Sequence, residues 1–392
     1  MSGHRDTDVV VIGAGIMGLA AAWQLADLDR TVTLLEQFHQ SHDLGSSHGG
    51  TRGHRYSYED PAYARMAMEA ELWWRVLERR TGASLLSMVG GVDIGVPGTA
   101  SFDATVATVR ELGLDHTLVA AGDAAASDLA PFVLPARSAA LLQPGAGLIS
   151  ASRSRAALGA SAEESGVTTV ERCLVEAVEP VGSDRVEVHA RVGEEPRACR
   201  ANHVVIAAGP WTGELAARSP GLGLPAPFPV NVLACEPVYF AIAEHAVPQR
   251  LFYIHPDGEF GDGVYGQSQL VSGDPGILKL GLHGGVPVAV PGGEHPTGGA
   301  DAERLRNRLI EVIPGARDAR AVRSDRCYYS MTPDERFVID FAPGSARVVV
   351  MAGFSGHGFK FAPLLGRLAA ELATDGVTQL GGMDMSLLRF AE

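Results

Sequence analysis

One stretch near the N-terminus constrains the fold more than any other part of the chain. It begins with the apolar run Val9–Ile12 and continues with Gly13, Gly15 and Gly18 in G-x-G-x-x-G spacing. A helical run and a second apolar run follow, and the second run ends at Glu36. In such a βαβ unit the glycines permit a tight turn, close approach of a pyrophosphate, and close contact between helix and strand. The stretch therefore predicts a dinucleotide-binding unit of the Rossmann type.

The start of the helix and the acidic residue narrow the choice of dinucleotide. The helix N-terminus presents backbone N–H groups and the positive end of its dipole to the phosphates. Glu36 lies where a carboxylate accepts hydrogen bonds from the ribose hydroxyls of an adenosine. A carboxylate at that position argues against a 2′-phosphate, so we expect FAD or NAD rather than NADP.

The length and composition bound the remaining possibilities. A chain of 392 residues is long for a single core, so we expect two domains. The formal net charge of -14 disfavours nucleic acid and anionic membranes as partners. The four cysteines show neither C-x-x-C nor metal-binding spacing, so we expect no disulfide framework and no metal site. The N-terminal apolar run is broken by glycines and no window is long enough to span a membrane, which favours a cytoplasmic protein.

Two segments after the first βαβ unit differ in character. Small residues dominate the predicted loop Ser41–Gly53, which allows its backbone to approach a ligand, and Arg52 and Arg55 close it. Asp60–Pro61 then starts a helix with a capping residue and a proline at its first position, and Gly82 ends this helix.

The pattern of strands changes along the chain. A helix is predicted over Leu148–Ser165, and the apolar strands His203–Trp211 and Arg347–Ala352 suit the same parallel sheet as the first unit. Short β-like runs with Gly, Pro and Asp turns fill the other segments and predict a separate β-rich layer. We therefore predict an α/β fold, α+β overall, with a Rossmann-like nucleotide-binding domain and a substrate-binding domain of mixed or antiparallel sheet. The first domain is expected to comprise residues 1–84, 145–222 and 320–392, and the second residues 85–144 and 223–319.

Motifs spread along the chain resemble those of a known family. The strings C-Y-Y-S-M-T-P-D-E-R-F-V-I-D at Cys327–Asp340 and A-G-F-S-G-H-G-F-K-F at Ala352–Phe361 carry most of the resemblance. The segments Thr51–Arg55, Tyr265–Gly266 and Lys279–His283 add to it. With these motifs the chain resembles monomeric sarcosine oxidase and N-methyltryptophan oxidase, which are covalent-FAD amine oxidases of the D-amino-acid-oxidase superfamily. The resemblance covers nearly the whole sequence.

The resemblance implies roles for individual residues. Cys327 matches the cysteine that bonds through sulfur to the 8-methyl carbon of the flavin, and Arg52 matches the arginine that lies against the flavin ring. Arg55 and Lys360 match the pair that holds a substrate carboxylate through charge-assisted hydrogen bonds. Lys279 matches the lysine near flavin N5, where a positive charge favours electron transfer to O2 by stabilising developing superoxide. Taken alone, these residues would be interpreted as a buried thiol, surface ion pairs and an edge-strand lysine.

Further residues match the substrate pocket and the shell around the flavin, among them Tyr265, His283 and His357. The residues implied to be catalytic are Lys279, Arg55, Lys360, Tyr265, His283 and Arg52. The residues expected to bind FAD are Gly13, Gly15, Ile16, Met17, Gly18, Glu36, Gln37, Ser46, Ser47, Thr51, Arg52, Val175, Ala208, Gly209, Trp211, Cys327, Met331, Phe354, Gly356, His357, Gly358, Phe359 and Lys360.

The implied reaction is oxidation of a secondary or cyclic amino acid. A hydride passes from carbon to N5 of FAD and leaves an imine, and O2 then takes the two electrons to give hydrogen peroxide. We expect one FAD per chain, attached through Cys327, an amino acid and O2 as small-molecule partners, and a monomer or weak homodimer. The alternatives are a dehydrogenase with another acceptor and a catalytically silent flavoprotein. An NAD-dependent dehydrogenase is a third alternative, which the Cys327 motif contradicts.

The sequence departs from the family pattern at one place. Gln267 and Gln269 follow Tyr265–Gly266, where the family usually shows an apolar residue, and the connection Leu270–Gly276 is longer. These positions are expected to line or border the pocket. We therefore expect a substrate that is more polar or larger than sarcosine.

Overall fold

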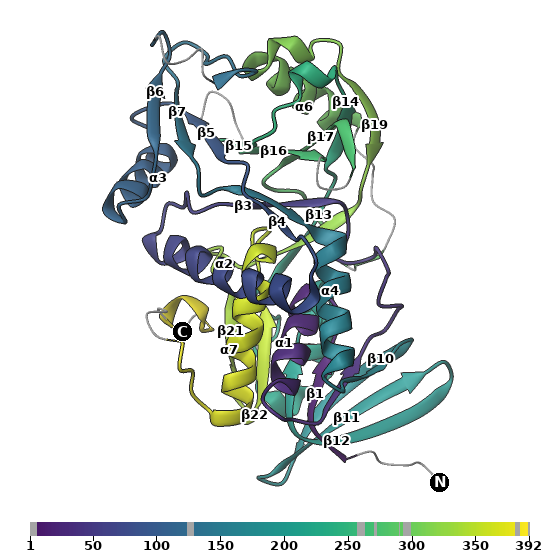
Figure 1. Cartoon of the computed structure of the whole chain (residues 1–392). Helices are drawn as coiled ribbons and strands as arrows, with labels where there is room; N and C mark the ends of the chain where they lie inside the picture. Colours follow the sequence, from purple (N-terminus) through teal and green to yellow (C-terminus); the bar gives the residue numbers. More distant parts are fainter. Residues whose placement is uncertain are drawn as a thin grey trace.

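Two eight-stranded sheets organise the chain, one above the other in Figure 1. The structure is a computed structural model that describes residues 6–123, 129–256, 263–269, 273–289, 291–292, 299–380 and 385–390. Among these described residues, no helix is both long and apolar enough to cross a membrane.

The first sheet has a parallel centre built from the apolar runs of the sequence. The predicted βαβ unit is confirmed, since β1 pairs in parallel with β2 and also with β12, which pairs in turn with β22. The segments Val9–Ile12, Val204–Ile206 and Val348–Ala352 of these strands are almost fully buried, as expected for the centre of a sheet covered on both faces. The strands of this sheet are β1 (Asp6–Ile12), β2 (Val32–Leu35), β9 (Thr168–Val170), β10 (Cys173–Val181), β11 (Arg185–Val192), β12 (Glu195–Ile206), β21 (Val338–Ala342) and β22 (Ser345–Ala352).

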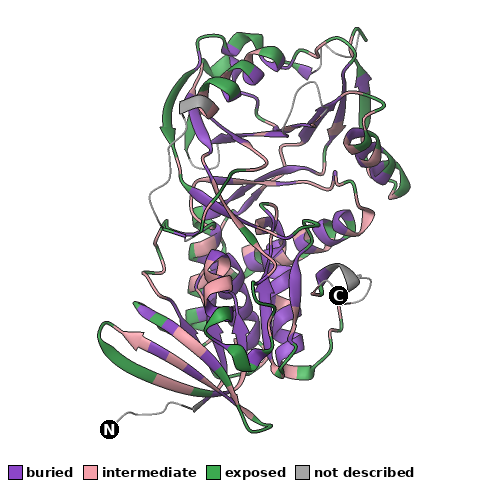
Figure 2. Cartoon of the chain, turned by 180° about the vertical axis from the view of Figure 1, so that it is seen from behind, coloured by how far each residue is buried: buried purple, intermediate pink, exposed green. Residues whose placement is uncertain are grey.

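Helices α1 (Ile16–Ala26), α4 (Ala151–Glu164) and α7 (Ala362–Asp375) lie together on one face of this sheet (Figure 1). The contact between α1 and α7 is close, because a Cβ on Gly366 would stand 2.5 Å from the backbone carbon of Ala20. Figure 2 shows that the central strands are buried, whereas the far end of the β10–β11 hairpin is exposed. The packed helices fix the carboxyl ends of the central strands, where the site lies.

Helix α2 (Pro61–Thr81) forms as the sequence predicts. The Asp60 side chain accepts a hydrogen bond of 2.8 Å from the Ala62 backbone N–H, and Gly82 ends the helix with φ of 68°. The buried Trp74 of this helix donates 2.7 Å to the backbone oxygen of Lys360. The helix therefore holds the C-terminal motif in place.

The second sheet is mixed, as predicted. Its order is β19-β14-β17-β16-β15-β5-β7-β6, and β15 runs parallel to β5, whereas the other neighbouring strands in this order are antiparallel. Its strands are β5 (Gly91–Gly95), β6 (Thr117–Ala120), β7 (Ala139–Gln143), β14 (Val238–Ala241), β15 (Leu251–Ile254), β16 (Val264–Gln269), β17 (Asp274–Leu282) and β19 (Arg320–Ser324). The helices α3 (Ala100–Glu111) and α6 (Gly299–Val312) belong to the same half of the molecule (Figure 1), and the short α5 (Thr212–Ala217) follows β12.

Two three-stranded sheets complete the structure. One contains β3 (Thr51–His54), β4 (Leu86–Ser87) and β8 (Gly147–Ser150), and the other β13 (Asn231–Cys235), β18 (Val286–Pro287) and β20 (Cys327–Met331). The chain passes from one large sheet to the other several times, and β19 still belongs to the second sheet. The division into a nucleotide-binding and a substrate-binding domain stays a prediction.

The pairing of β3 with β8 corrects two predictions. The loop predicted to run to Gly53 gives way to a strand at Thr51, and the helix predicted from Leu148 starts only at Ala151. The cause is common to both differences, because Gly147–Ser150 pairs antiparallel with Thr51–His54 and satisfies the backbone groups of both segments. Arg52 is thereby fixed on a strand instead of a loop.

Candidate active site

A cavity of about 600 Å³ lies at the carboxyl ends of β1 and β2 and extends to the second sheet. Strands β16 and β17 contribute Tyr265, Gln267 and Lys279 to its wall. The segment after β22 contributes Phe354, Gly356, His357, Gly358, Phe359 and Lys360. The cavity therefore joins the predicted nucleotide unit, the second sheet and the C-terminal motif, although these are far apart in the sequence.

Most residues that the sequence predicts for the site line this cavity. The exceptions are Gly18, Thr51 and Met331, which are not in its wall. Gly18 is buried inside helix α1, and Thr51 is fully buried beneath the wall. The predicted residues in the wall are Gly13, Gly15, Ile16, Met17, Glu36, Gln37, Ser46, Ser47, Arg52, Arg55, Val175, Ala208, Gly209, Trp211, Tyr265, Lys279, His283, Cys327, Phe354, Gly356, His357, Gly358, Phe359 and Lys360.

The glycine turn at one end has no room for side chains. Gly13 has φ of 100°, and a Cβ there would stand 2.5 Å from the backbone oxygen of Ala207. A Cβ on Gly18 would stand 1.8 Å from the backbone oxygen of Gly13. These distances make glycine obligatory at both positions. The turn exposes backbone at the N-terminus of α1, which suits an anionic ligand.

Two polar side chains brace this turn. Glu36 is buried at the end of β2, and its oxygens accept hydrogen bonds of 2.7 Å from Ala14 N–H and 2.8 Å from Phe38 N–H. Ser47 Oγ accepts a 3.0 Å hydrogen bond from Ile16 N–H in the first turn of α1. A carboxylate has about four lone-pair directions, so Glu36 retains acceptor capacity for a ligand's hydroxyl groups.

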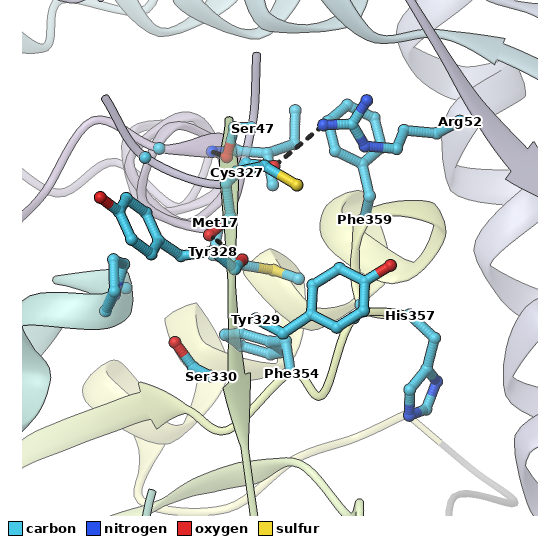
Figure 3. Close-up of a pocket in the computed structure, with 18 of the residues that line it drawn as sticks. Met17, Ser47, Arg52, Cys327, Tyr328, Tyr329, Ser330, Phe354, His357 and Phe359 are labelled. Atoms are coloured by element: carbon cyan, nitrogen blue, oxygen red, sulfur yellow. Dashed lines mark hydrogen bonds between the residues drawn. The ribbon is translucent and has the colours of Figure 1, made fainter. Parts of the chain in front are cut away.

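Arg52 lies in the middle of the cavity wall. Its guanidinium donates to the backbone oxygens of Thr51, Ser46 and His48 at 2.9, 3.0 and 2.5 Å, and lies 5.2 Å from the centre of the Phe359 ring. Carbonyl oxygens fix its geometry without cancelling its charge. Figure 3 shows the sulfur of Cys327 pointing to the same side of β20 as this guanidinium.

Lys279 lies on β17 and is a buried residue of the same cavity wall. Its Nζ is 3.5 Å from the backbone oxygen of Thr51, and the whole residue is only 4% exposed. Burial lowers the pKa of Lys279 to about 7, and repulsion from Arg52 acts in the same direction. This buried lysine therefore exchanges its proton near neutral pH.

A second cationic cluster lies at the other end of the cavity. Lys360 Nζ donates to Tyr58 OH at 2.7 Å and to the backbone oxygen of His357 at 2.9 Å. Both Lys360 Nζ and Arg55 Cζ lie 5.2 Å from the centre of the Tyr58 ring. Burial, followed by repulsion from Arg55, lowers the pKa of Lys360 well below its ordinary value. The two cations predicted to act together thus converge on one tyrosine.

The sequence analysis missed the partners of this cluster. Arg55 Nη1 lies 3.0 Å from Asp93 Oδ1, and His255 Nε2 lies 3.2 Å from the same oxygen. Tyr253 lies under the guanidinium of Arg55, with 4.6 Å between its ring centre and Cζ. Asp93 lies in the β-like run Gly91–Gly95. A carboxylate between the apolar neighbours of this run is the sequence feature that could have indicated a buried ion pair. Burial works against the charge on Asp93, but the His255 hydrogen bond and Arg55 outweigh it and lower its pKa.

The side chains of the two glutamines form hydrogen bonds with strand β3. With its amide oriented to satisfy both ends, Gln267 donates to Thr51 O at 3.0 Å and accepts from Gly53 N–H at 3.1 Å. Gln269 Nε2 donates to Thr51 Oγ1 at 2.6 Å. Gln267 lines the cavity as expected, but Gln269 is not in the wall. Because both amides are engaged with β3, they give no support to the expectation of a polar substrate.

Comparison with known proteins identifies the family. The family model described as FAD dependent oxidoreductase matches residues 8–372. The chain belongs to this family of FAD-dependent oxidoreductases. A probable sarcosine oxidase of Arabidopsis thaliana is 32% identical, with 98% of this chain and 93% of that protein aligned. The monomeric sarcosine oxidase of Bacillus sp. (strain NS-129) is 31% identical, with 97% and 95% aligned.

Two further similarities agree with this family. An N-methyl-L-tryptophan oxidase of Yersinia pestis is 28% identical, with 98% of this chain and 100% of that protein aligned. The solved structure of NikD, an unusual amino acid oxidase essential for nikkomycin biosynthesis, superimposes with a TM-score of 0.82 at 26% identity, over 98% and 97% of the two chains. The resemblance stated from the motifs is confirmed, and so is the Rossmann-like fold.

FAD is the cofactor of this FAD-dependent oxidoreductase, and the residues present fit it. The glycine turn offers backbone to the pyrophosphate, since a Cβ on Gly13 would meet the Ala207 oxygen. Glu36 at the end of β2 has acceptor capacity for the adenosine ribose. Cys327, Arg52 and Lys279 lie where the wall passes from the first half of the molecule to the second. The resemblance predicts these three near the flavin and the Arg55–Lys360 cluster at the substrate carboxylate.

Proposed function

We propose that the protein is an oxidase of a secondary or cyclic amino acid, with FAD as its cofactor and O2 as the electron acceptor. One observation carries this proposal: Arg55 and Lys360 converge on Tyr58 in the same cavity as Cys327 and Lys279. The names of the relatives, sarcosine oxidase and N-methyl-L-tryptophan oxidase, support an amino acid with a substituted nitrogen.

The protein residues contribute binding and charge. Bound FAD supplies the two-electron oxidation of the C–N bond to an imine. Lys360 and Arg55 bind the substrate carboxylate through charge-assisted hydrogen bonds, which orients the carbon next to the nitrogen. Lys279, when protonated, places a positive charge where O2 gains electrons, so that the products are an imine and hydrogen peroxide.

Covalent attachment through Cys327 is part of the proposal. The thiol lines the cavity, and the charges of Arg52 and Lys279 favour its thiolate. Acid precipitation of purified protein should leave a yellow pellet. Cys327→Ala should release the colour into the supernatant, and a colourless wild-type pellet would exclude attachment.

The reaction class is tested with substrates under argon. N-substituted and cyclic amino acids should bleach the flavin, and readmitted air should restore the colour and release one hydrogen peroxide per cycle. Colour that returns only with an added acceptor indicates a dehydrogenase, and no bleaching by any amino acid contradicts the proposal.

The carboxylate clamp has its own test. An amino acid and its decarboxylated amine should differ by about 10- to 150-fold in kcat/KM for each lost charge-assisted bond. The difference should largely disappear in the Arg55→Met, Lys360→Met double variant. If the plain amine is already an equal substrate of the wild type, the two cations do not bind a carboxylate.

We further propose that the protein acts in the cytoplasm as a monomer or weak homodimer. The formal net charge of -14 supports repulsion between copies at low ionic strength. Light scattering across a range of concentrations tests the oligomeric state.

A further inference from the structure

We propose that Cys235 is a positioning residue for Cys327: its thiol donates a hydrogen bond to the sulfur of Cys327 and so favours the thiolate that attaches to FAD. The inference rests on the covalent attachment proposed above. It concerns a residue to which the sequence analysis gave no role.

The register of two strands brings the cysteines together. β13 and β20 are antiparallel, and Cys235 pairs directly with Cys327. Residues directly opposite in an antiparallel pair project to the same face, with Cβ atoms about 4.5–5.5 Å apart. Both side chains are buried, at 5% and 8% exposure, in a small cluster with Tyr329. The two thiols are free, and Cys327 also lines the cavity.

The Cys235 thiol has a choice of acceptors. Its sulfur lies 3.7 Å from the backbone oxygen of Leu233, which is a weak acceptor contact for a thiol. A thiolate on Cys327 is a stronger acceptor because charge-assisted hydrogen bonds are roughly twice as strong as neutral ones. The proton of Cys235 therefore turns toward Cys327 when Cys327 ionises. Gly285 leaves room for this thiol, since a Cβ there would stand 2.9 Å from the Cys235 sulfur.

The surrounding charges decide which cysteine ionises. Lys279 on β17 and Arg52 on β3 act on Cys327 with positive charge, and Asp325 opposes them. Tyr265 on β16 and Tyr329 on β20 are further titratable groups around the pair, and both are held neutral because burial raises their pKa values. Because two cations and one carboxylate act on Cys327, their combined effect favours the thiolate of Cys327. Cys327 also lines the cavity.

The direction of the pKa shifts agrees with this division of roles. The hydrogen bond from Cys235, assisted by Lys279 and Arg52 and opposed by burial, lowers the pKa of Cys327 to about 7. The same hydrogen bond, together with burial, raises the pKa of Cys235. Paired cysteines in C-x-x-C motifs lower a thiol pKa in a comparable way. Here the pairing comes from two adjacent strands.

Attachment of FAD to Cys327 is a two-electron oxidation that consumes one O2. The Cys327 sulfur forms a bond to the 8-methyl carbon, one C–H bond of that methyl group breaks, and its hydrogen leaves as a proton. Two electrons remain on the ring system. O2 takes these two electrons together with two protons, one from the methyl group and one that the Cys327 thiol released on ionising, and becomes hydrogen peroxide. Cys235 keeps its proton throughout, so its role is confined to holding the Cys327 sulfur as an anion.

The first experiment follows attachment over time. The full chain is produced in riboflavin-starved cells, FAD is added, and the acid-precipitable flavin is measured for wild type, Cys235→Ala, Cys235→Val and Cys235→Ser. At pH 7 the Ala and Val variants should attach FAD about two- to eightfold more slowly, because the loss of thiolate exceeds the gain in nucleophilicity at higher pKa. The Ser variant, which keeps a donor, should stay close to wild type.

The pH dependence separates this role from packing. At pH 9.5, where Cys327 ionises without help, the Ala and Val variants should equal or exceed the wild-type rate. A variant that only disturbs the fold would be slow at every pH, and Cys235→Val keeps the apolar volume of the site. Equal slowing at pH 7 and pH 9.5, or a Ser variant as slow as Ala, would overturn the inference.

A second measurement does not depend on attachment. Alkylation of Cys327 by iodoacetamide in the FAD-free chain, counted on its peptide by mass, should show a midpoint higher by about one pH unit or more in Cys235→Ala than in wild type. Coincident midpoints would overturn the inference. A colourless wild-type pellet with shifted midpoints would instead refute covalent attachment and leave the hydrogen bond established.

Discussion

Arg55 enters the cavity wall already paired with Asp93, whose Oδ1 lies 3.0 Å from Arg55 Nη1. Lys360, at the other side of Tyr58, donates only to neutral oxygens in the contacts found among the described residues. The charge of Arg55 is thus compensated before a substrate arrives, whereas that of Lys360 is not. A substrate carboxylate would supply the anion that Lys360 lacks.

This pairing predicts a large stability loss in Asp93→Asn. The substitution leaves the Arg55 guanidinium without its anion in a mostly buried site, and breaking such a pair costs about 3–5 kcal/mol. Urea denaturation at pH 7 should show a loss of this size in the free energy of unfolding. Since the folded-state pKa of Asp93 is lowered, the stability that its carboxylate contributes should be lost as the pH falls below the ordinary value of 3.8.

A double variant controls for packing. Asp93→Asn combined with Arg55→Met removes both charges and should be more stable than Asp93→Asn alone. Millimolar acetate, which can supply an anion beside Arg55, should partly restore the single variant. If the double variant is no more stable than the single one, the loss comes from packing and not from the unpaired charge.

Lys360 predicts that ligand binding takes up a proton. Burial and the repulsion from Arg55 lower its pKa in the free protein, so part of the population is neutral at alkaline pH. A bound carboxylate raises the pKa again because it favours the charged form. Calorimetric titration of a carboxylate inhibitor at pH 8, in buffers of different ionisation enthalpy, should therefore show net proton uptake of up to one proton.

The matched controls are Lys360→Met and Tyr58→Phe. Lys360→Met should abolish the proton uptake and weaken binding. Tyr58→Phe removes the hydroxyl that accepts a hydrogen bond from Lys360 and keeps the lysine. Uptake that persists unchanged in Lys360→Met would assign the proton to another group.

Local chemistry explains which parts were predictable from the sequence. The glycines at 13, 15 and 18 carry their own steric reason, and the caps Asp60 and Gly82 fix the ends of α2. Contacts between distant strands have no such local signal. The contact of Tyr253 with Arg55 needs β15 beside β5, where Tyr253 pairs with Asp93, and the facing of Cys235 with Cys327 needs the register of β13 on β20.

The two glutamines show that a local sequence signal can also suggest a role that the contacts between distant strands do not support. Gln267 and Gln269 are polar residues beside a predicted pocket, and a polar residue there suggests a polar ligand. Their amides instead bond Thr51 and Gly53, because β3 runs beside β16 where the sequence predicts a loop. A strand that pairs with a distant segment cannot be read from a glycine-rich stretch alone.

Lys279 provides the last prediction, which concerns oxygen. Its ammonium on β17 is a buried positive charge 3.5 Å from the backbone oxygen of Thr51, and a preorganised charge of this kind is worth about 100-fold or more in rate. In stopped-flow experiments Lys279→Met should slow reoxidation by O2 by about that factor and change reduction by substrate much less. Because the pKa of Lys279 is about 7, its charge is present below that pH, so wild-type reoxidation should slow as the pH rises past about 7. An anion bound beside Lys279 Nζ favours the charged form of the lysine, so it moves the pH midpoint of reoxidation upward.

The Lys279→Met variant should lose this pH dependence together with the rate. Arg323→Met is the matched control. Arg323 on β19 and Lys279 on β17 pair with Tyr239 of β14 from opposite sides, yet the Arg323 side chain is 57% exposed. Water screens a charge at that position, so the control should reoxidise at nearly the wild-type rate. Equal losses in both half-reactions of Lys279→Met, or a pH profile that survives the substitution, would mean that the reaction with O2 does not depend on this charge.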